Sequence, residues 1–251
     1  MIPKIIHYCW FGYGEKSKLI KKCIKSWSKI CPDYEIKEWN EENFDISMAP
    51  KYVQDAYKEK RWAFVADYAR LWIIYNYGGV YLDTDVELIR NIDDVLKDDA
   101  FFAFANSTKI NTGLGFGAIK GFEFVKTLMD DYDKIDFYLE DGTVNTLTCV
   151  AINTPCFLNY GFKLNNTLQK INGCTLYPTD YFCPKAYNTY KPEITENTFS
   201  IHWYNLSWKT KENKDKHIKG IRKDYIKHLP NKALIKVLGN ENYEKLKGKL
   251  K

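Results

Sequence analysis

Two acidic side chains, Asp83 and Asp85, follow the run 78–82 and are well placed to bind a cation. Residues 80–82 predict a short buried strand, and the Gly-Gly pair before them predicts a break. Because side chains two apart on a strand point the same way, we expect both carboxylates on one face. Adjacent carboxylates repel unless a cation lies between them, and Mn²⁺ or Mg²⁺ favours oxygen ligands and often bridges to phosphates. The pattern predicts a divalent metal site, with two solvated aspartates at a strand end as the alternative.

Trp10 is a candidate for binding a nucleobase. It ends the strand predicted over residues 2–10, and a glycine-containing turn over residues 11–14 follows it. An indole at the end of a strand can stack on a base, although a core aromatic side chain is the alternative that the sequence leaves open.

Asp67 and Arg70 lie three apart on the helix predicted over residues 61–77, so they share a face. An ordinary surface ion pair, worth roughly 0.2–0.5 kcal/mol, is one interpretation. The helix is otherwise apolar, however, and charged groups among apolar neighbours are costly unless they bind something. We therefore expect Arg70 to contact phosphate or sugar hydroxyls, and Asp67 to accept hydrogen bonds from sugar hydroxyls.

His202 begins a polar and aromatic cluster at residues 202–208. Brought back to the two aspartates, its imidazole would be a third metal ligand, and Ser207 and Trp208 would contact a diphosphate. A lone histidine is often a core residue with satisfied hydrogen bonds, and that alternative stays open.

The predicted elements place these groups at one edge of an α/β fold. Strand 2–10, helix 18–30 and strand 34–39 begin a doubly wound arrangement, in which ligands bind outside the carboxyl ends of the strands. Since Trp10 and the aspartate pair both follow strands, we expect them in one crevice. The other expected elements are a strand over 101–104, a glycine-rich loop over 111–117, helices over 121–132 and 144–152, and a strand over 201–203.

Charge divides the chain of 251 residues unevenly. The net charge is +5, but residues 209–251 hold 14 Lys/Arg and five Asp/Glu, which leaves residues 1–208 net acidic. We expect a domain over 1–208 and a basic helical extension over 209–251. Apolar residues of this tail, such as Ile218, Ile221 and Tyr225, could rest on an anionic membrane surface. A solvated helix that caps the domain is the alternative.

The seven cysteines form no C-x-x-C pair and predict reduced, mostly buried thiols. The sequence shows no signal-peptide pattern and no run of about 18 apolar residues. We expect a cytoplasmic protein, peripheral on the inner face of the plasma membrane if the tail binds there.

The sequence resembles glycosyltransferase family 32. Residues 5–12 are similar to the opening of that family, and Asp67-x-x-Arg70 followed by residues 77–85 is similar to its sugar-binding region with the DXD motif. The pattern His202-Trp203-x-x-x-Ser207-Trp208 supports the resemblance, which spans most of residues 1–208. It implies a GT-A type, Rossmann-like nucleotide-sugar-binding fold with a mixed central sheet.

The resemblance implies that the donor is a UDP-sugar bound with Mn²⁺. Trp10 would stack on uracil, and Tyr81 would lie near the nucleotide. Asp83 would contact ribose and sugar, Asp85 would bind the metal, and His202 would be a further metal or diphosphate ligand.

For the sugar, Asp67 and Arg70 would hold the donor hexose, with Asn111 and Asp141 on the sugar and acceptor side. The implied reaction is retaining hexosyl transfer to a hydroxyl of a glycan. If the basic tail lies on a membrane, a lipid-linked oligosaccharide of bacterial capsular or surface polysaccharide synthesis would be in reach as the acceptor. No carboxylate nucleophile is obvious, so we expect a front-face mechanism.

Two other classes of protein fit parts of the pattern. A phosphatase of the haloacid dehalogenase type also has Asp-x-Asp after an apolar strand, but it continues with Thr or Val where this chain has Glu87. A nucleic-acid-binding protein would suit the basic tail, yet the body is acidic and lacks a stripe of interleaved basic and aromatic residues. We therefore expect no nucleic-acid partner.

Overall fold

The computed structural model describes residues 1–206 and 211–227, together with residues 239 and 242. By their contacts, the described residues fall into two compact units. The larger unit holds residues 1–186 and 192–206, and the smaller one holds residues 187–191 and 211–227. The domain boundary after residue 208 stays a prediction.

The larger unit opens with a β-α-β arrangement, as the sequence predicts. Strand β1 (Ile5–Cys9) leads through helix α1 (Lys18–Ile30) to β2 (Glu35–Trp39), and the two strands pair in parallel. Ser17 caps α1, because its side chain accepts a hydrogen bond from the Ile20 N–H. The inner face of α1 buries Cys23 and Trp27.

Helix α3 (Trp62–Tyr77) and strand β3 (Gly79–Tyr81) carry the central motif. Two glycines with positive φ, Gly78 at 67° and Gly79 at 102°, turn the chain from the helix into the strand. A Cβ at Gly79 would lie 2.8 Å from the Ile5 carbonyl oxygen, so only glycine lets β3 lie this close to β1. Strand β3 pairs in parallel with β1.

The main sheet is mixed, as expected. Its order is β2-β1-β3-β7-β5-β9-β8, with β6 paired to β5. Pairs β1–β2, β1–β3 and β5–β9 are parallel, whereas β3–β7, β5–β7, β5–β6 and β8–β9 are antiparallel. The remaining strands of this sheet are β5 (Ala100–Asn106), β6 (Lys109–Ile110), β7 (Phe116–Ala118), β8 (Gln169–Ile171) and β9 (Cys174–Tyr177).

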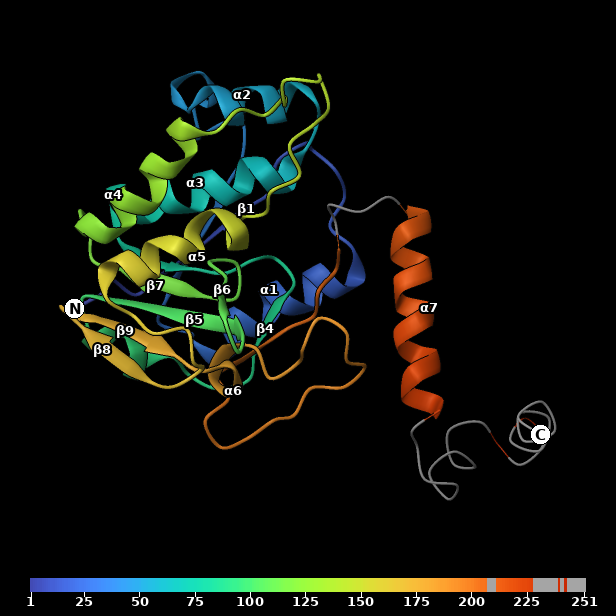
Figure 1. Ribbon diagram of the computed structural model, residues 1–251. Helices are drawn as coiled ribbons and strands as arrows, with labels where there is room; N and C mark the ends of the chain where they lie inside the picture. The colour runs from blue at the N-terminus through green and yellow to red at the C-terminus, as the bar shows by residue number, and fades with distance from the viewer. Residues whose placement is uncertain (207–210, 228–238, 240–241, 243–251) are drawn as a thin grey trace. The chain divides into compact units, whose positions relative to one another are not determined.

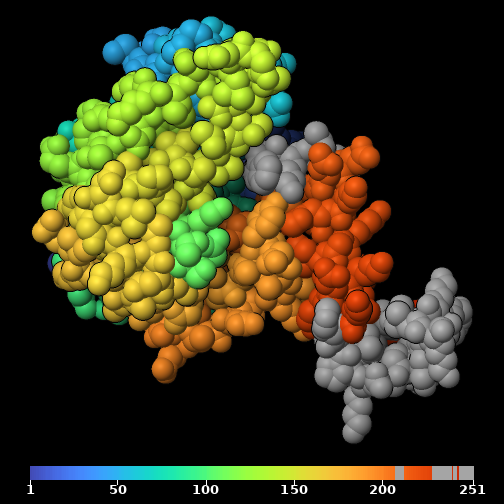
Figure 2. Space-filling view, viewed as in Figure 1, coloured from blue at the N-terminus to red at the C-terminus, as the bar shows by residue number. Residues whose placement is uncertain are grey.

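Helices lie on both faces of this sheet, so β5 is apolar at successive positions. Phe102 packs into the core that includes α3, and its neighbour Phe101 packs into the core that includes Trp27 of α1. Helices α2 (Lys51–Lys58), α3, α4 (Glu123–Asp130) and α5 (Cys149–Tyr160) gather on one side of the sheet (Figure 1). On the surface in Figure 2, α2 in blue lies beside the yellow-green segment that leads to α5, and Tyr138 donates a hydrogen bond to Glu59 there.

A second, two-stranded sheet joins β4 (Val86–Leu88) antiparallel to β10 (Ser200–His202). This pairing connects the chain just after the acidic motif with a segment near the end of the larger unit. Short helical elements complete the unit: η1 (Ile46–Met48), η2 (Asp93–Lys97), η3 (Asp131–Lys134) and α6 (Thr179–Phe182).

The helix predicted over residues 144–152 is wrong in both bounds. Residues 144 and 145 pair with the chain at 137–138 instead, where the Asn145 N–H donates to the Phe137 carbonyl. Helix α5 starts at Cys149 and continues through Pro155, which the sequence suggests as a stop. Buried side chains on both sides of the proline, among them Phe157, hold the helix by packing, and this overrides the local cost of proline.

In the smaller unit, α7 (Lys211–Lys227) packs against residues 187–191. The Tyr187 ring lies 4.6 Å from the His217 ring, and Tyr190 stacks on Tyr225 with ring centroids 4.9 Å apart. One side of this helix is therefore covered by tyrosines. Of the extension expected over 209–251, residues 209–210, 228–238, 240–241 and 243–251 lie outside the described part of the chain.

All seven cysteines are unpaired and buried, as expected. Among the described helices, none has the length and apolar character needed to cross a membrane.

Candidate active site

The acidic motif lies on a turn, not on a strand. Strand β3 ends at Tyr81, and the Val86 N–H donates to the Asp83 carbonyl at 2.9 Å, which closes a tight turn over residues 83–86. The strand alternation expected for the two carboxylates is therefore wrong. They lie together because this turn carries the chain from the main sheet into β4.

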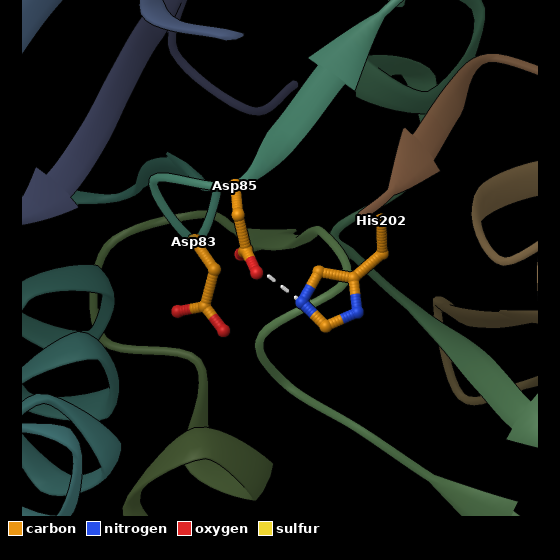
Figure 3. Close-up of side chains that lie close together, drawn as sticks. All are labelled: Asp83, Asp85 and His202. Carbon is orange, nitrogen blue, oxygen red and sulfur yellow. Dashed lines mark ion pairs between the residues drawn. The ribbon is translucent and has the colours of Figure 1, made fainter. Parts of the chain in front are cut away.

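His202 joins the two aspartates from β10. It pairs with Val86 in the two-stranded sheet, and its Nε2 lies 3.1 Å from Asp85 Oδ1. Figure 3 shows the three side chains pointing toward one another from the turn and the strand. One ligand atom from each lies within 4.8 Å of the others. The structure thus brings together the three residues predicted to bind a metal.

The donor set fits a divalent metal ion. Two carboxylates and an imidazole are typical ligands of such ions. The Nδ1 atom of His202 is buried without a hydrogen-bond partner in the described structure, so this imidazole is not satisfied as an ordinary core histidine would be.

Burial and charge set the protonation of this group. Burial raises the pKa of Asp83, and the nearby Arg70 guanidinium opposes this only in part. For Asp85, burial also acts upward, but His202 and the Asn205 N–H, 2.6 Å from Oδ2, hold its pKa below the ordinary value. Burial alone would lower the pKa of His202, and the Asp85 carboxylate outweighs it and raises that pKa.

Arg70 connects the second predicted pair to the acidic motif. Its guanidinium forms an ion pair with Asp67 and lies 3.6 Å from Asp83 Oδ1. The same guanidinium stacks over the Tyr81 ring at 5.1 Å. Asp67 and Arg70 are 8% and 3% exposed, so the surface-pair interpretation is wrong.

The loop after β6 packs closely against Asp83 and Arg70. The Asp83 N–H donates to the Gly113 carbonyl at 3.1 Å, and Asn111 Oδ1 accepts from the Gly113 N–H at 2.7 Å. A Cβ at Gly113 would lie 2.1 Å from Asp83 Oδ2 and 2.7 Å from Arg70 Nη1. Asn111 is thus connected to Asp83 through Gly113, which forms a hydrogen bond with each of them. The tight approach at Gly113 was missed from sequence, although the glycine-rich loop itself is the signal for it.

Trp10 follows β1 at the same edge of the sheet, because β1 and β3 are parallel neighbours. The indole is partly exposed, and its N–H donates to the Gly14 carbonyl at 2.7 Å. The Lys16 ammonium lies 5.1 Å from the indole centroid and pairs with Glu38 at 2.9 Å. The turn therefore holds the ring at the edge of the sheet that the acidic motif also follows.

Three predicted residues are not part of this group as described. Asp141 accepts hydrogen bonds from the Thr143 N–H and hydroxyl within an exposed turn, so its acceptor role stays a prediction. Ser207 and Trp208 lie outside the described residues. A residue that sequence reasoning missed is Cys149, whose thiol lies 3.6 Å from Asn111 Oδ1 and for which no sequence signal exists.

Comparison with known proteins agrees with this geometry. Residues 17–102 match the family model described as glycosyltransferase sugar-binding region containing DXD motif. An inositol phosphoceramide mannosyltransferase of Schizosaccharomyces pombe is 30% identical over 142 residues, 54% of this chain and 38% of that protein. A mannosyl phosphorylinositol ceramide synthase of Saccharomyces cerevisiae is 25% identical over 191 residues, 72% of this chain and 49% of that protein. The chain spans less than half the length of these relatives.

Among solved structures, the PaToxG glycosyltransferase matches with a TM-score of 0.50 and 18% identity, over 63% of this chain and 69% of that one. The GT-A fold predicted from sequence is confirmed, and the matches favour this interpretation over a dehalogenase-type phosphatase. The acidic turn, the helix before it and the sheet edge all lie within or beside the matched region. Within residues 17–102, the chain is therefore similar to glycosyltransferase sugar-binding regions that contain a DXD motif.

Proposed function

We propose that this protein is a metal-dependent glycosyltransferase that moves a hexose from a UDP-sugar to an acceptor hydroxyl. The observation that carries the proposal is the convergence of Asp83, Asp85 and His202 beside the buried Asp67–Arg70 pair. The first group suits a metal and a diphosphate, and the second suits the hydroxyls of a sugar. The family match supports a sugar as the group that is bound.

Asp83, Asp85 and His202 would hold the metal, with Mn²⁺ as the proposed ion. An imidazole ligand suits Mn²⁺ better than Mg²⁺, which prefers an all-oxygen octahedron. When bound, the ion would neutralise charge that develops on the departing diphosphate. Trp10 would stack on the base. Burial raises the pKa of Asp67, and Arg70 would oppose this and orient Asp67 toward sugar hydroxyls.

In the proposed reaction, the bond from the sugar C1 to the phosphate oxygen breaks and a bond to the acceptor oxygen forms. The acceptor proton passes to the leaving phosphate, and the configuration at C1 is retained. This front-face course is part of the proposal. Trapping of a covalent glycosyl-enzyme would contradict it.

A lipid-linked glycan at the inner face of the plasma membrane is the proposed acceptor, as in surface polysaccharide synthesis. The relatives' names support a lipid-borne hydroxyl, because both describe transfer to inositol-containing ceramides. A cavity of about 370 Å³ lined in part by Tyr138, Leu139 and Glu140 adjoins Asp141 in sequence.

The test is a screen of UDP- and GDP-sugars for Mn²⁺-dependent hydrolysis. We expect turnover of at least one UDP-hexose, and its loss in Asp85→Ala. Turnover of a GDP-sugar alone would keep the transferase and change the donor. If the folded protein binds and hydrolyses no nucleotide sugar, the proposal is wrong.

A further inference from the structure

Lys185 is a buried cation that the proposed site does not yet use. The residue is only 8% exposed, and none of the described acidic residues forms an ion pair with it. Its ammonium lies 5.3 Å from the centroid of the Tyr204 ring. Burial lowers the pKa of Lys185. A buried ammonium without a carboxylate is costly, so this position is suited to receive an anion.

Tyr204 connects Lys185 to the metal-binding group. The Tyr204 and His202 rings have centroids 4.2 Å apart. With the 5.3 Å from the ammonium to Tyr204, Lys185 Nζ lies at most about 9.5 Å from the imidazole centroid. A diphosphate held by a metal at His202 would therefore lie within reach of this ammonium.

The surrounding backbone holds Lys185 and Tyr204 in one arrangement. The Cys183 sulfur lies 3.1 Å from the Tyr204 hydroxyl and 3.4 Å from the Lys185 carbonyl oxygen. Tyr204 has φ at 52°, a left-handed conformation that a bulky residue rarely adopts. The next residue, Asn205, donates its N–H to Asp85. The same short segment thus positions the lysine and orders a predicted metal ligand.

Other cations at this edge are already engaged. Arg70 pairs with Asp67 and lies near Asp83, Lys16 pairs with Glu38, and Lys22 pairs with Glu87. A nucleoside diphosphate brings more negative charge than one divalent ion offsets once two carboxylates bind that ion. A cation that has no carboxylate partner and lies beside Asp83, Asp85 and His202 would neutralise the remaining negative charge of the diphosphate.

We propose that Lys185 binds the diphosphate oxygens of the nucleotide donor. The proposal rests on the proposed function and assigns one of its phosphate-binding residues. Lys185 would stabilise bound and departing diphosphate alike, while base and sugar contacts stay with other residues. If Lys185 only packs on Tyr204, its replacement would instead affect the stability of the fold. It would then have the same effect on the binding of UDP and of uridine.

The experiment measures binding of UDP and of uridine by calorimetry, with the full chain saturated with Mn²⁺. We expect Lys185→Gln to weaken UDP binding by roughly 10- to 100-fold, the loss typical of a hydrogen bond to a charged group. Uridine and Mn²⁺ affinities should not change, and Lys185→Arg should restore part of the UDP affinity. Lys97→Gln is the matched control, since Lys97 is an exposed lysine paired with Asp94.

Unchanged UDP affinity in folded Lys185→Gln would overturn the inference, as would an equal loss for uridine. If Lys185→Gln does not fold, acetylation of the wild-type protein followed by mass spectrometry serves instead. UDP, and not uridine, should then protect Lys185, and equal labelling with either would contradict the inference. If the wild-type protein binds neither UDP nor GDP, the proposed function itself is wrong. If the wild-type protein binds UDP and Lys185→Gln binds it equally well, only the inference about Lys185 is wrong.

Discussion

His202 Nε2 lies 3.1 Å from Asp85 Oδ1, although the two residues are far apart in the sequence. The pairing of β10 with β4 sets this distance, because His202 is opposite Val86, the residue after Asp85. The Trp203 N–H also donates to the Asp85 carbonyl at 3.0 Å. Backbone pairing therefore fixes the imidazole against the acidic turn before any metal binds.

Replacing this imidazole should weaken metal binding. We expect His202→Ala to reduce Mn²⁺ affinity by at least about 10- to 100-fold, the loss typical even for partners outside the ligand shell. Titration calorimetry with the folded variants gives the measurement. His217→Ala is the control, since His217 lies in the smaller unit against Tyr187. Equal Mn²⁺ affinity in wild type and His202→Ala would exclude His202 as a ligand.

Removing the Arg70 guanidinium should destabilise the fold. In Arg70→Met, the buried Asp67 carboxylate loses its ion-pair partner, and we expect the free energy of unfolding to fall by roughly 3–5 kcal/mol. The double variant Asp67→Asn/Arg70→Met should recover part of the loss. Urea denaturation measures both. Lys126→Met, which breaks the exposed pair with Asp130, should cost under about 1 kcal/mol, and an equal cost at both sites would contradict the prediction.

A methyl group at Gly113 should disturb the site directly. Gly113→Ala would place its Cβ within 2.1 Å of Asp83 Oδ2, so the carboxylate must move. We expect a loss of roughly 1–3 kcal/mol in stability, together with weaker Mn²⁺ binding. Gly14→Ala is the control, because a Cβ there meets nothing within 4 Å. Thermal melting and Mn²⁺ titration check both effects, and wild-type behaviour of Gly113→Ala would show that the loop yields freely.

Acid should destabilise the protein through His7. The Trp39 N–H donates to its Nδ1 at 3.0 Å, and its Nε2 donates to the Gly78 carbonyl at 2.9 Å, so the folded protein holds it neutral. Burial, which outweighs the Gly78 hydrogen bond, lowers the pKa of His7 from 6.5 to about 4. Neutral His7 therefore contributes to the free energy of unfolding. This contribution is complete above pH 6.5 and is lost as the pH falls toward 4.

At pH 5 the protonation of His7 should lower the free energy of unfolding by roughly 2 kcal/mol relative to pH 7. The free energy of unfolding, measured from pH 7 to pH 4.5 in wild type and His7→Gln, isolates this part as the difference between the two curves. The variant should be less stable at pH 7 and should lose less on acidification. Parallel curves would show that His7 does not titrate in this window.

If the protein binds a membrane, the lysines of α7 should be needed for that binding. Changing Lys216, Lys219 and Lys223 to Glu should abolish sedimentation with vesicles that contain anionic lipid, since each lysine contributes about 1 kcal/mol near such a surface. The same charge change at Lys97, Lys134 and Lys170 of the larger unit is the matched control. Loss of binding in both sets, or in neither, would contradict a specific role for α7.

Local sequence patterns were sufficient for much of the fold. Helix α1 begins and ends at the predicted residues, and the strands before Trp10 and before the acidic motif were found because apolar runs and glycines mark them. The GT-A fold followed from motif resemblance. The helix at α5 was misplaced, because tertiary packing around Pro155 outweighs the local signal.

For the site, the sequence by itself determined which residue types are present: a carboxylate pair, an Asp–Arg pair at helical spacing, and a histidine far along the chain. Only the tertiary structure decided that a turn, and not a strand, aligns Asp83 with Asp85, and that β10 carries His202 back to them. It also decided the approach of Gly113 and the burial of Lys185. These are long-range contacts, which depend on how the sheets pair and which no local periodicity encodes.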